Sequence, residues 1–113
     1  MATYVLMTRL SPEAVSKPGA ILELEKAVAG KLKSQCPQAK WLASYSILGG
    51  CDYLDIFEAP DEGVASQVAL VIRSLGHATT ETWVATPWAR FRELARAVSG
   101  SQPKARSRPR RQA

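Results

Sequence analysis

The stretch from Leu48 to Asp61 constrains the fold more than any other part of the chain. Its residues are Leu-Gly-Gly-Cys-Asp-Tyr-Leu-Asp-Ile-Phe-Glu-Ala-Pro-Asp. The glycine pair is typical of a tight turn with positive backbone angles, and the apolar run after it is typical of a strand. Pro60 and Asp61 are typical of the start of a helix. The stretch therefore predicts a β-hairpin that leads directly into a helix.

Patterns on both sides of this hairpin predict the remaining elements. Apolar residues at helical spacing, Ile21, Leu24, Val28 and Leu32, indicate a long amphipathic helix after a break at 17–19. Gly76 stands where a left-handed residue is expected to end the helix that starts near Pro60. We predict strands over 3–9, 40–48, 52–59 and 78–86, a short helix from Ser11, main helices over 20–35 and 62–75, and a short C-terminal helix over 87–98.

This order of elements predicts an α+β fold of the ferredoxin-like βαββαβ type. Right-handed crossovers place both main helices on one face of a four-stranded antiparallel sheet. The opposite face then needs cover, because several large apolar side chains are expected on the strands. They are Tyr4 or Val5, Trp41 or Leu42, Tyr53, Phe57 and Trp83. We therefore expect a homo-oligomer, a dimer or higher, in which sheet packs against sheet.

Length and composition agree with one small domain over residues 1–98. Apolar residues make up 46% of the 113-residue chain and charged residues 22%, and no apolar run is long enough to cross a bilayer. The N-terminus does not have the pattern of a signal peptide, so we expect a cytoplasmic protein with no membrane contact. Cys36 and Cys51 are expected to be reduced thiols.

The basic charge of the chain is concentrated in its last residues. All five excess charges belong to residues 101–113, since the ten other basic residues are balanced by ten acidic ones. We predict that residues 99–113 form a disordered basic tail, because they contain no large apolar side chain. Such a tail can contact nucleic acid or an anionic surface without reading sequence, although a solvated extension without a partner is the commoner role.

Four segments resemble the GYD domain family. They are Met1-Ala2-Thr3-Tyr4-Val5, Leu48-Gly49-Gly50-Cys51-Asp52-Tyr53-Leu54, Glu58-Ala59-Pro60-Asp61 and 74–82. The resemblance covers roughly residues 2 to 90 and implies a dimeric α/β-barrel protein whose subunits pack sheet to sheet. It implies no particular reaction. The tyrosine of the family's Gly-Tyr-Asp is Cys51 in this chain.

Acidic residues inside two strands are the sharpest site candidates. Asp55 is expected to share a face with Tyr53 and Phe57, and Glu81 with Trp83, so that both acids enter one aromatic-lined cleft. The alternative is that these acids lie at an interface or an edge strand and pair with basic residues.

His77 is the only histidine and the natural candidate for proton transfer near neutral pH. Its alternative role is that of a polar residue at the end of a helix. One histidine and scattered acids do not match a transition-metal site, so we predict neither a metal nor a cofactor.

Three functions remain open from the sequence. The first is a small oligomeric protein that binds an apolar or aromatic molecule in a cleft on the sheet, with Tyr53, Phe57 and Trp83 as lining residues. The second is a cofactor-free enzyme, isomerase-like or monooxygenase-like, with His77, Asp55 and Glu81 as catalytic groups. The third is association with nucleic acid through the basic tail.

Overall fold

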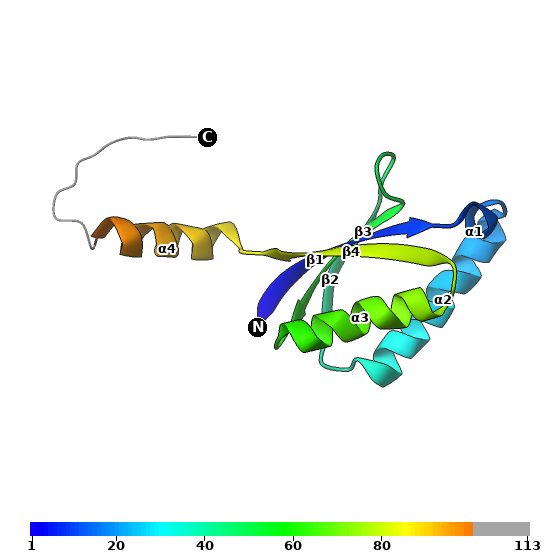
Figure 1. Ribbon diagram of the computed structural model, residues 1–113, viewed down its shortest axis with the longest axis horizontal. Helices are drawn as coiled ribbons and strands as arrows, with labels where there is room; N and C mark the ends of the chain where they lie inside the picture. Colours follow the sequence, from blue (N-terminus) through cyan, green and yellow to red (C-terminus); the bar gives the residue numbers. More distant parts are fainter. Residues whose placement is uncertain (101–113) are drawn as a thin grey trace.

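In the computed structural model, which describes residues 1–100, helices cover one face of a four-stranded antiparallel sheet (Figure 1). The strands are β1 (Ala2–Leu10), β2 (Lys40–Ser46), β3 (Tyr53–Ala59) and β4 (Ala78–Ala85), in the spatial order β2-β3-β1-β4. The helices are α1 (Pro12–Val15), α2 (Pro18–Gln35), α3 (Glu62–Ser74) and α4 (Trp88–Gly100). This arrangement confirms the predicted ferredoxin-like fold.

Local signals set the helix ends as the sequence predicts. The Ser11 hydroxyl accepts a hydrogen bond from the Ala14 amide at 3.3 Å, and the Asp61 carboxylate accepts one from the Val64 amide at 3.0 Å. Gly76 follows α3 with a φ of +82°, which residues with a Cβ adopt only at a cost.

Strand register divides the side chains of the sheet between two faces. We call the covered side the helix face. It carries Leu6 and Thr8 of β1, and their partners Asp55 and Tyr53 of β3. Because side chains alternate along a strand, the intervening residues lie on the opposite side, which we call the open face. Its residues are Thr3, Val5, Met7 and Arg9 of β1, Leu54, Ile56 and Glu58 of β3, Lys40, Ala43 and Tyr45 of β2, and Thr79, Glu81, Trp83 and Ala85 of β4.

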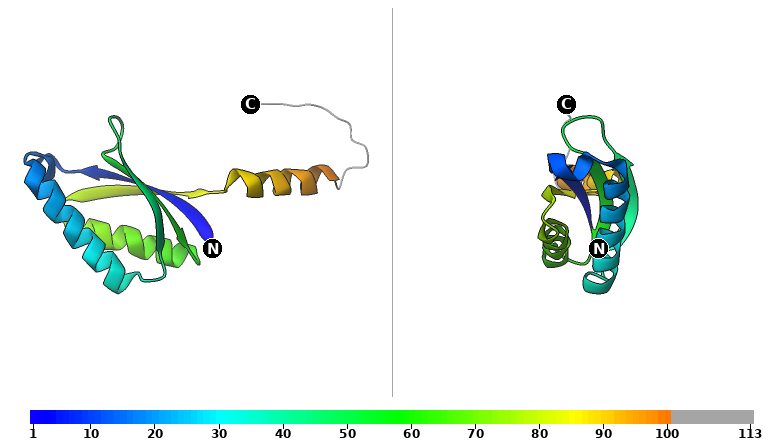
Figure 2. Two further views of the ribbon diagram at one scale, coloured as in Figure 1. Left: turned by 180° about the vertical axis from the view of Figure 1, so that it is seen from behind. Right: turned by 90° about the vertical axis from the view of Figure 1, so that its right-hand side faces the viewer.

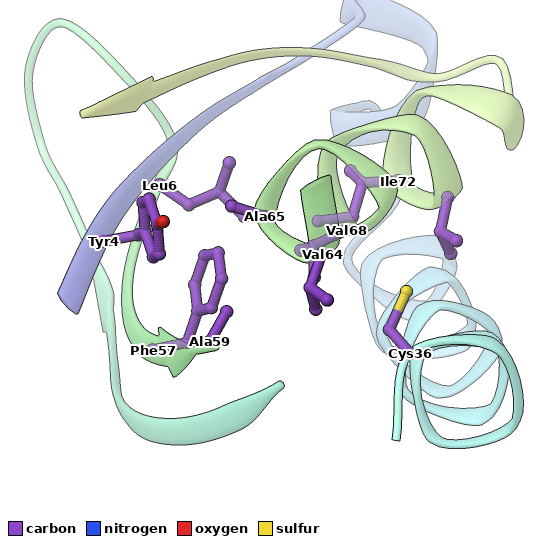
Figure 3. Packing of buried hydrophobic residues seen from close by; sticks show 10 residues of the cluster. Tyr4, Leu6, Cys36, Phe57, Ala59, Val64, Ala65, Val68 and Ile72 are labelled. Carbon is purple, nitrogen blue, oxygen red and sulfur yellow. The ribbon is translucent and has the colours of Figure 1, made fainter. Parts of the chain in front are cut away.

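The core lies between the helix face and α3. Leu6, Phe57 and Val68 are completely buried, and Figure 3 shows strand and α3 side chains of this core pointing toward one another. The Phe57 ring stacks on Tyr4 at 5.4 Å and on Trp41 at 5.0 Å between centroids. The prediction that Tyr53 and Phe57 belong to the uncovered face is therefore wrong, because both lie on the side of the helices.

The connection between β2 and β3 differs from the predicted two-glycine turn. Neither Gly49 nor Gly50 has a positive φ, and the loop runs over residues 47–52. Asp52 fastens it to β1: its amide donates to the Thr8 carbonyl at 2.8 Å, and its carboxylate accepts from the Leu10 amide at 2.6 Å. The Arg9 guanidinium also donates to the Gly50 carbonyl. These contacts, rather than a tight turn, shape the hairpin.

A β-bulge at Leu42 changes which side chains of β2 point to each side of the sheet. Trp41 pairs with Phe57 on the helix face, whereas Ala43 pairs with Ile56 on the open face. The extra residue breaks the simple alternation, so Trp41 lies on the opposite side of β2 from Ala43 and Tyr45.

Helix α4 leaves the domain at the end of β4 and extends away from it (Figures 1 and 2). It contains no buried residue, and Trp88 is 69% exposed. The helix ends at Gly100, two residues beyond the predicted Val98, and the rest of the predicted tail lies outside the described residues. None of the helices in residues 1–100 is long and apolar enough to span a membrane.

Replacing Asp52 by alanine should lower the free energy of unfolding by about 1–3 kcal/mol, because the partly buried Leu10 amide would lose its acceptor. Urea unfolding followed by circular dichroism measures this change. Glu23→Ala, which removes an exposed acid of α2, is the matched control. Equal stabilities of the two variants would contradict the anchoring role of Asp52.

Candidate functional site

A cavity of about 1030 Å³ separates α2 from the β2 and β3 side of the helix face. Helix α3 packs closely on the sheet with six buried residues, whereas α2 has none. The predicted apolar stripe of α2 therefore faces this cavity as a half-buried wall. The stripe consists of Ile21, Leu24, Val28 and Leu32.

The opposite wall of the cavity combines aromatic and polar side chains. Trp41 donates from its indole Nε1 to Asp55 Oδ1 at 3.2 Å and to Ser44 Oγ at 3.0 Å. Tyr53 and Thr8, which are paired across β1 and β3, also line the cavity. The cavity thus has an apolar helical wall and a wall of hydrogen-bonding groups on the sheet, as sites for small organic molecules commonly do.

Two groups that line this cavity have a raised pKa: burial raises the pKa of the Cys36 thiol, and Tyr53 is affected by charge as well as by burial. Burial raises the pKa of its phenol, and the negative charges of Asp52, Glu25 and Asp55 raise it further. Glu25 of α2 and Asp55 of β3 both line the cavity, so carboxylates from both walls act on Tyr53.

The structure brings together only part of the predicted site. Tyr53 and Asp55 line the cavity, and Phe57 lies beside them in the core beneath Trp41. Glu81 pairs with Met7 and therefore lies on the open face, where its carboxylate accepts from the Trp83 indole at 2.6 Å. Asp55 and Glu81 point to opposite sides of the sheet and do not form one cleft.

His77 lies far from both acids. It is an exposed residue in the turn before β4, and its carbonyl accepts from the Ser11 amide at 2.8 Å. The adjacent Ala78 pairs with Leu10, whereas Asp55 pairs with Leu6, so the two sites are separated by about 13 Å along β1. His77, Asp55 and Glu81 do not converge on an enclosed pocket.

Sequence reasoning missed several residues of this cavity, among them Glu25, Thr8 and Trp41. Glu25 reads as a solvent-facing acid of an amphipathic helix, and Thr8 as an ordinary strand residue. Trp41 enters only because of the bulge at Leu42, which no single-residue propensity indicates. Glu25 follows Ile21 by four residues and Leu24 by one, which places it at the border of the apolar stripe. This spacing was the sequence signal that could have indicated its position at the cavity.

A smaller cavity of about 350 Å³ lies at the loop between β2 and β3, on the side of the open face. Cys51, which is half-buried, lines it together with Met7, Arg9 and Glu81. Within residues 1–100 no group of three or more His, Cys, Asp or Glu side chains is placed to hold a metal ion.

Comparison with models of known protein families identifies the family of this chain. The model of the GYD domain matches residues 4–95, which is most of the chain. The chain belongs to the GYD family. The comparison with curated proteins found no match.

The position of Cys51 lies in the anchored loop of this GYD chain. Gly50 and Asp52 on either side of it hold the loop to the end of β1. Asp52 is directly followed by Tyr53, whose side chain enters the large cavity. The Gly-Cys-Asp segment thus has a structural role that positions one wall of the site.

The phenol of Tyr53 should ionise above the ordinary value of about 10 for tyrosine, because burial and nearby carboxylates raise its pKa. Folding favours the neutral phenol, so this group contributes to the stability of the folded state. The contribution is complete below a pH of about 10 and is lost as the pH rises through the pKa of the folded state. The pKa of Tyr53 is measured from the difference in tyrosinate absorbance between the wild type and Tyr53→Phe as the pH is raised. A difference curve centred at or below the ordinary value would contradict this placement of Tyr53.

Proposed function

We propose that this GYD protein binds a small apolar or aromatic molecule in the cavity between α2 and the sheet. The observation that carries the proposal is that α2 faces the sheet with an apolar stripe across an unfilled space of about 1030 Å³. Apolar side chains that face a gap lose the contacts that a packed helix makes, and a bound molecule restores them. The volume is at the upper end of the range for sites that enclose one small molecule.

The positions of the three candidate acid-base groups favour ligand binding over catalysis. A general acid or base must lie within hydrogen-bond reach of the reacting group. His77 lies in the turn before β4, Asp55 in the cavity and Glu81 on the open face. The cavity, by contrast, is already open beside Trp41.

A test of this site uses indole as a neutral aromatic probe, with binding measured by calorimetry and its position by NMR chemical-shift changes. Val28→Trp places a large side chain in the cavity from α2 and should weaken binding by about tenfold or more. Lys26→Trp, on the same helix outside the cavity, should leave the affinity unchanged. Equal affinities in both variants, or shifts confined to other regions, would contradict the proposal.

We also propose that the protein is a homo-oligomer in which a second copy covers the open face and α4. The open face holds Trp83, which is 56% exposed, and α4 presents the stacked pair Trp88 and Phe91 to solvent. The open face carries Glu58 and Glu81 together with Arg9 and Lys40, so its charges balance and do not oppose contact with an apolar surface. A second copy supplies such a surface, because it presents the same exposed aromatic side chains.

Light scattering of the purified full chain should give a mass of two subunits or a multiple of two. Trp83→Glu should shift the mass toward one subunit, because it places a charge in the interface. Leu70→Glu is the matched control, since Leu70 is 60% exposed on α3 and lies on neither surface. A wild-type protein that stays monomeric at high concentration would refute the proposal.

A further inference from the structure

Two carboxylates face the polar end of the large cavity without a basic partner. Asp55 on the sheet and Glu25 on α2 both line it. Within residues 1–100 an ion pair forms between Arg90 and Glu93 on α4, and neither of these residues lines the cavity. The lysine that lines the cavity, Lys33, lies eight residues after Glu25 on the same helix, or about 12 Å farther along its axis.

The hydrogen bonds of Asp55 leave one of its oxygens available. Trp41 donates to Oδ1, and no other described residue donates to the carboxylate. A carboxylate in a partly apolar site is stabilised by a donor or a positive charge. The unused Oδ2 therefore selects for a ligand group that donates hydrogen bonds.

A buried hydroxyl gives independent evidence for a polar ligand group at this end. Thr8 is only 4% exposed, it lines the cavity, and its hydroxyl makes no hydrogen bond with another described residue. Buried hydroxyls are rarely left unpaired, because each lost hydrogen bond costs about 1–3 kcal/mol. Thr8 is paired across the strands with Tyr53, so its hydroxyl and the phenol lie on the same side of the sheet.

From this arrangement we infer that the cavity selects a cationic aromatic amine: the aromatic body lies between the apolar stripe of α2 and Trp41, and the ammonium group lies between Asp55 and Glu25. This inference rests on the proposed ligand-binding function and specifies the chemical class of the ligand. An ammonium group has three donors and no acceptor, which matches two carboxylates and a hydroxyl. The ring of Trp41 adds a favourable contact for the cation.

Three probes with the same two-carbon indole skeleton test the inference on the full chain: tryptamine, the neutral alcohol tryptophol and the anion indolepropionate. Tryptamine should bind about tenfold or more tightly than tryptophol, and indolepropionate should bind most weakly. Calorimetry at low salt gives the three affinities. The quantity compared between variants is the affinity ratio of tryptamine to tryptophol.

Asp55→Asn removes the charge but keeps an oxygen that can accept from Trp41, and it should bring the ratio close to one. Glu25→Gln, at an exposed position of α2 that does not threaten the fold, should lower the ratio as well. Glu58→Gln is the control, because it removes an acid from the open face of the same strand and should leave the ratio unchanged.

The outcomes separate this inference from the function on which it rests. Equal affinities for all three probes, abolished by Val28→Trp, would overturn the selection of an amine while the binding site stands. A preference for tryptamine that persists in both Asp55→Asn and Glu25→Gln would overturn the assigned residues. If no probe binds, the ligand site and the amine preference fall together.

Discussion

The packing of α3 against β1 and β3 is the interaction on which the rest of the structure depends. Val64, Val68 and Ile72 of α3 close over Leu6 and Phe57, and this contact holds the core. Because α3 takes this position, α2 contacts α3, and its residues Val28 and Leu32 reach the core only as partly buried side chains. The unequal packing of two helices on one face produces the cavity.

The sequence predicts the order and ends of the elements well because these depend on local chemistry. A capping hydroxyl at Ser11, a capping carboxylate at Asp61 and a left-handed residue at Gly76 act within one helical turn. The apolar stripe of α2 is also readable from spacing alone. What such spacing does not show is the surface that the stripe faces, and here it faces a cavity instead of a packed sheet.

The site depends on contacts between distant segments, and for this reason only part of it is readable from the sequence. Tyr53 and Asp55 were predicted to share a face, which the register confirms. Glu81 was grouped with them because alternation alone does not reveal which side of the sheet a strand presents to the helices. Glu25 is 30 residues from Asp55 in the chain, and only the tertiary fold relates the two.

The bulge at Leu42 gives this architecture a simple evolutionary consequence. Trp41 and Ala43, on either side of Leu42, pair with neighbouring residues of β3, Phe57 and Ile56. Deleting Leu42 would therefore restore regular alternation and leave Trp41 stacked on Phe57 and within reach of Asp55. Strand β2 can thus lose one residue at this position, through a single-codon deletion, without losing the aromatic wall of the recess.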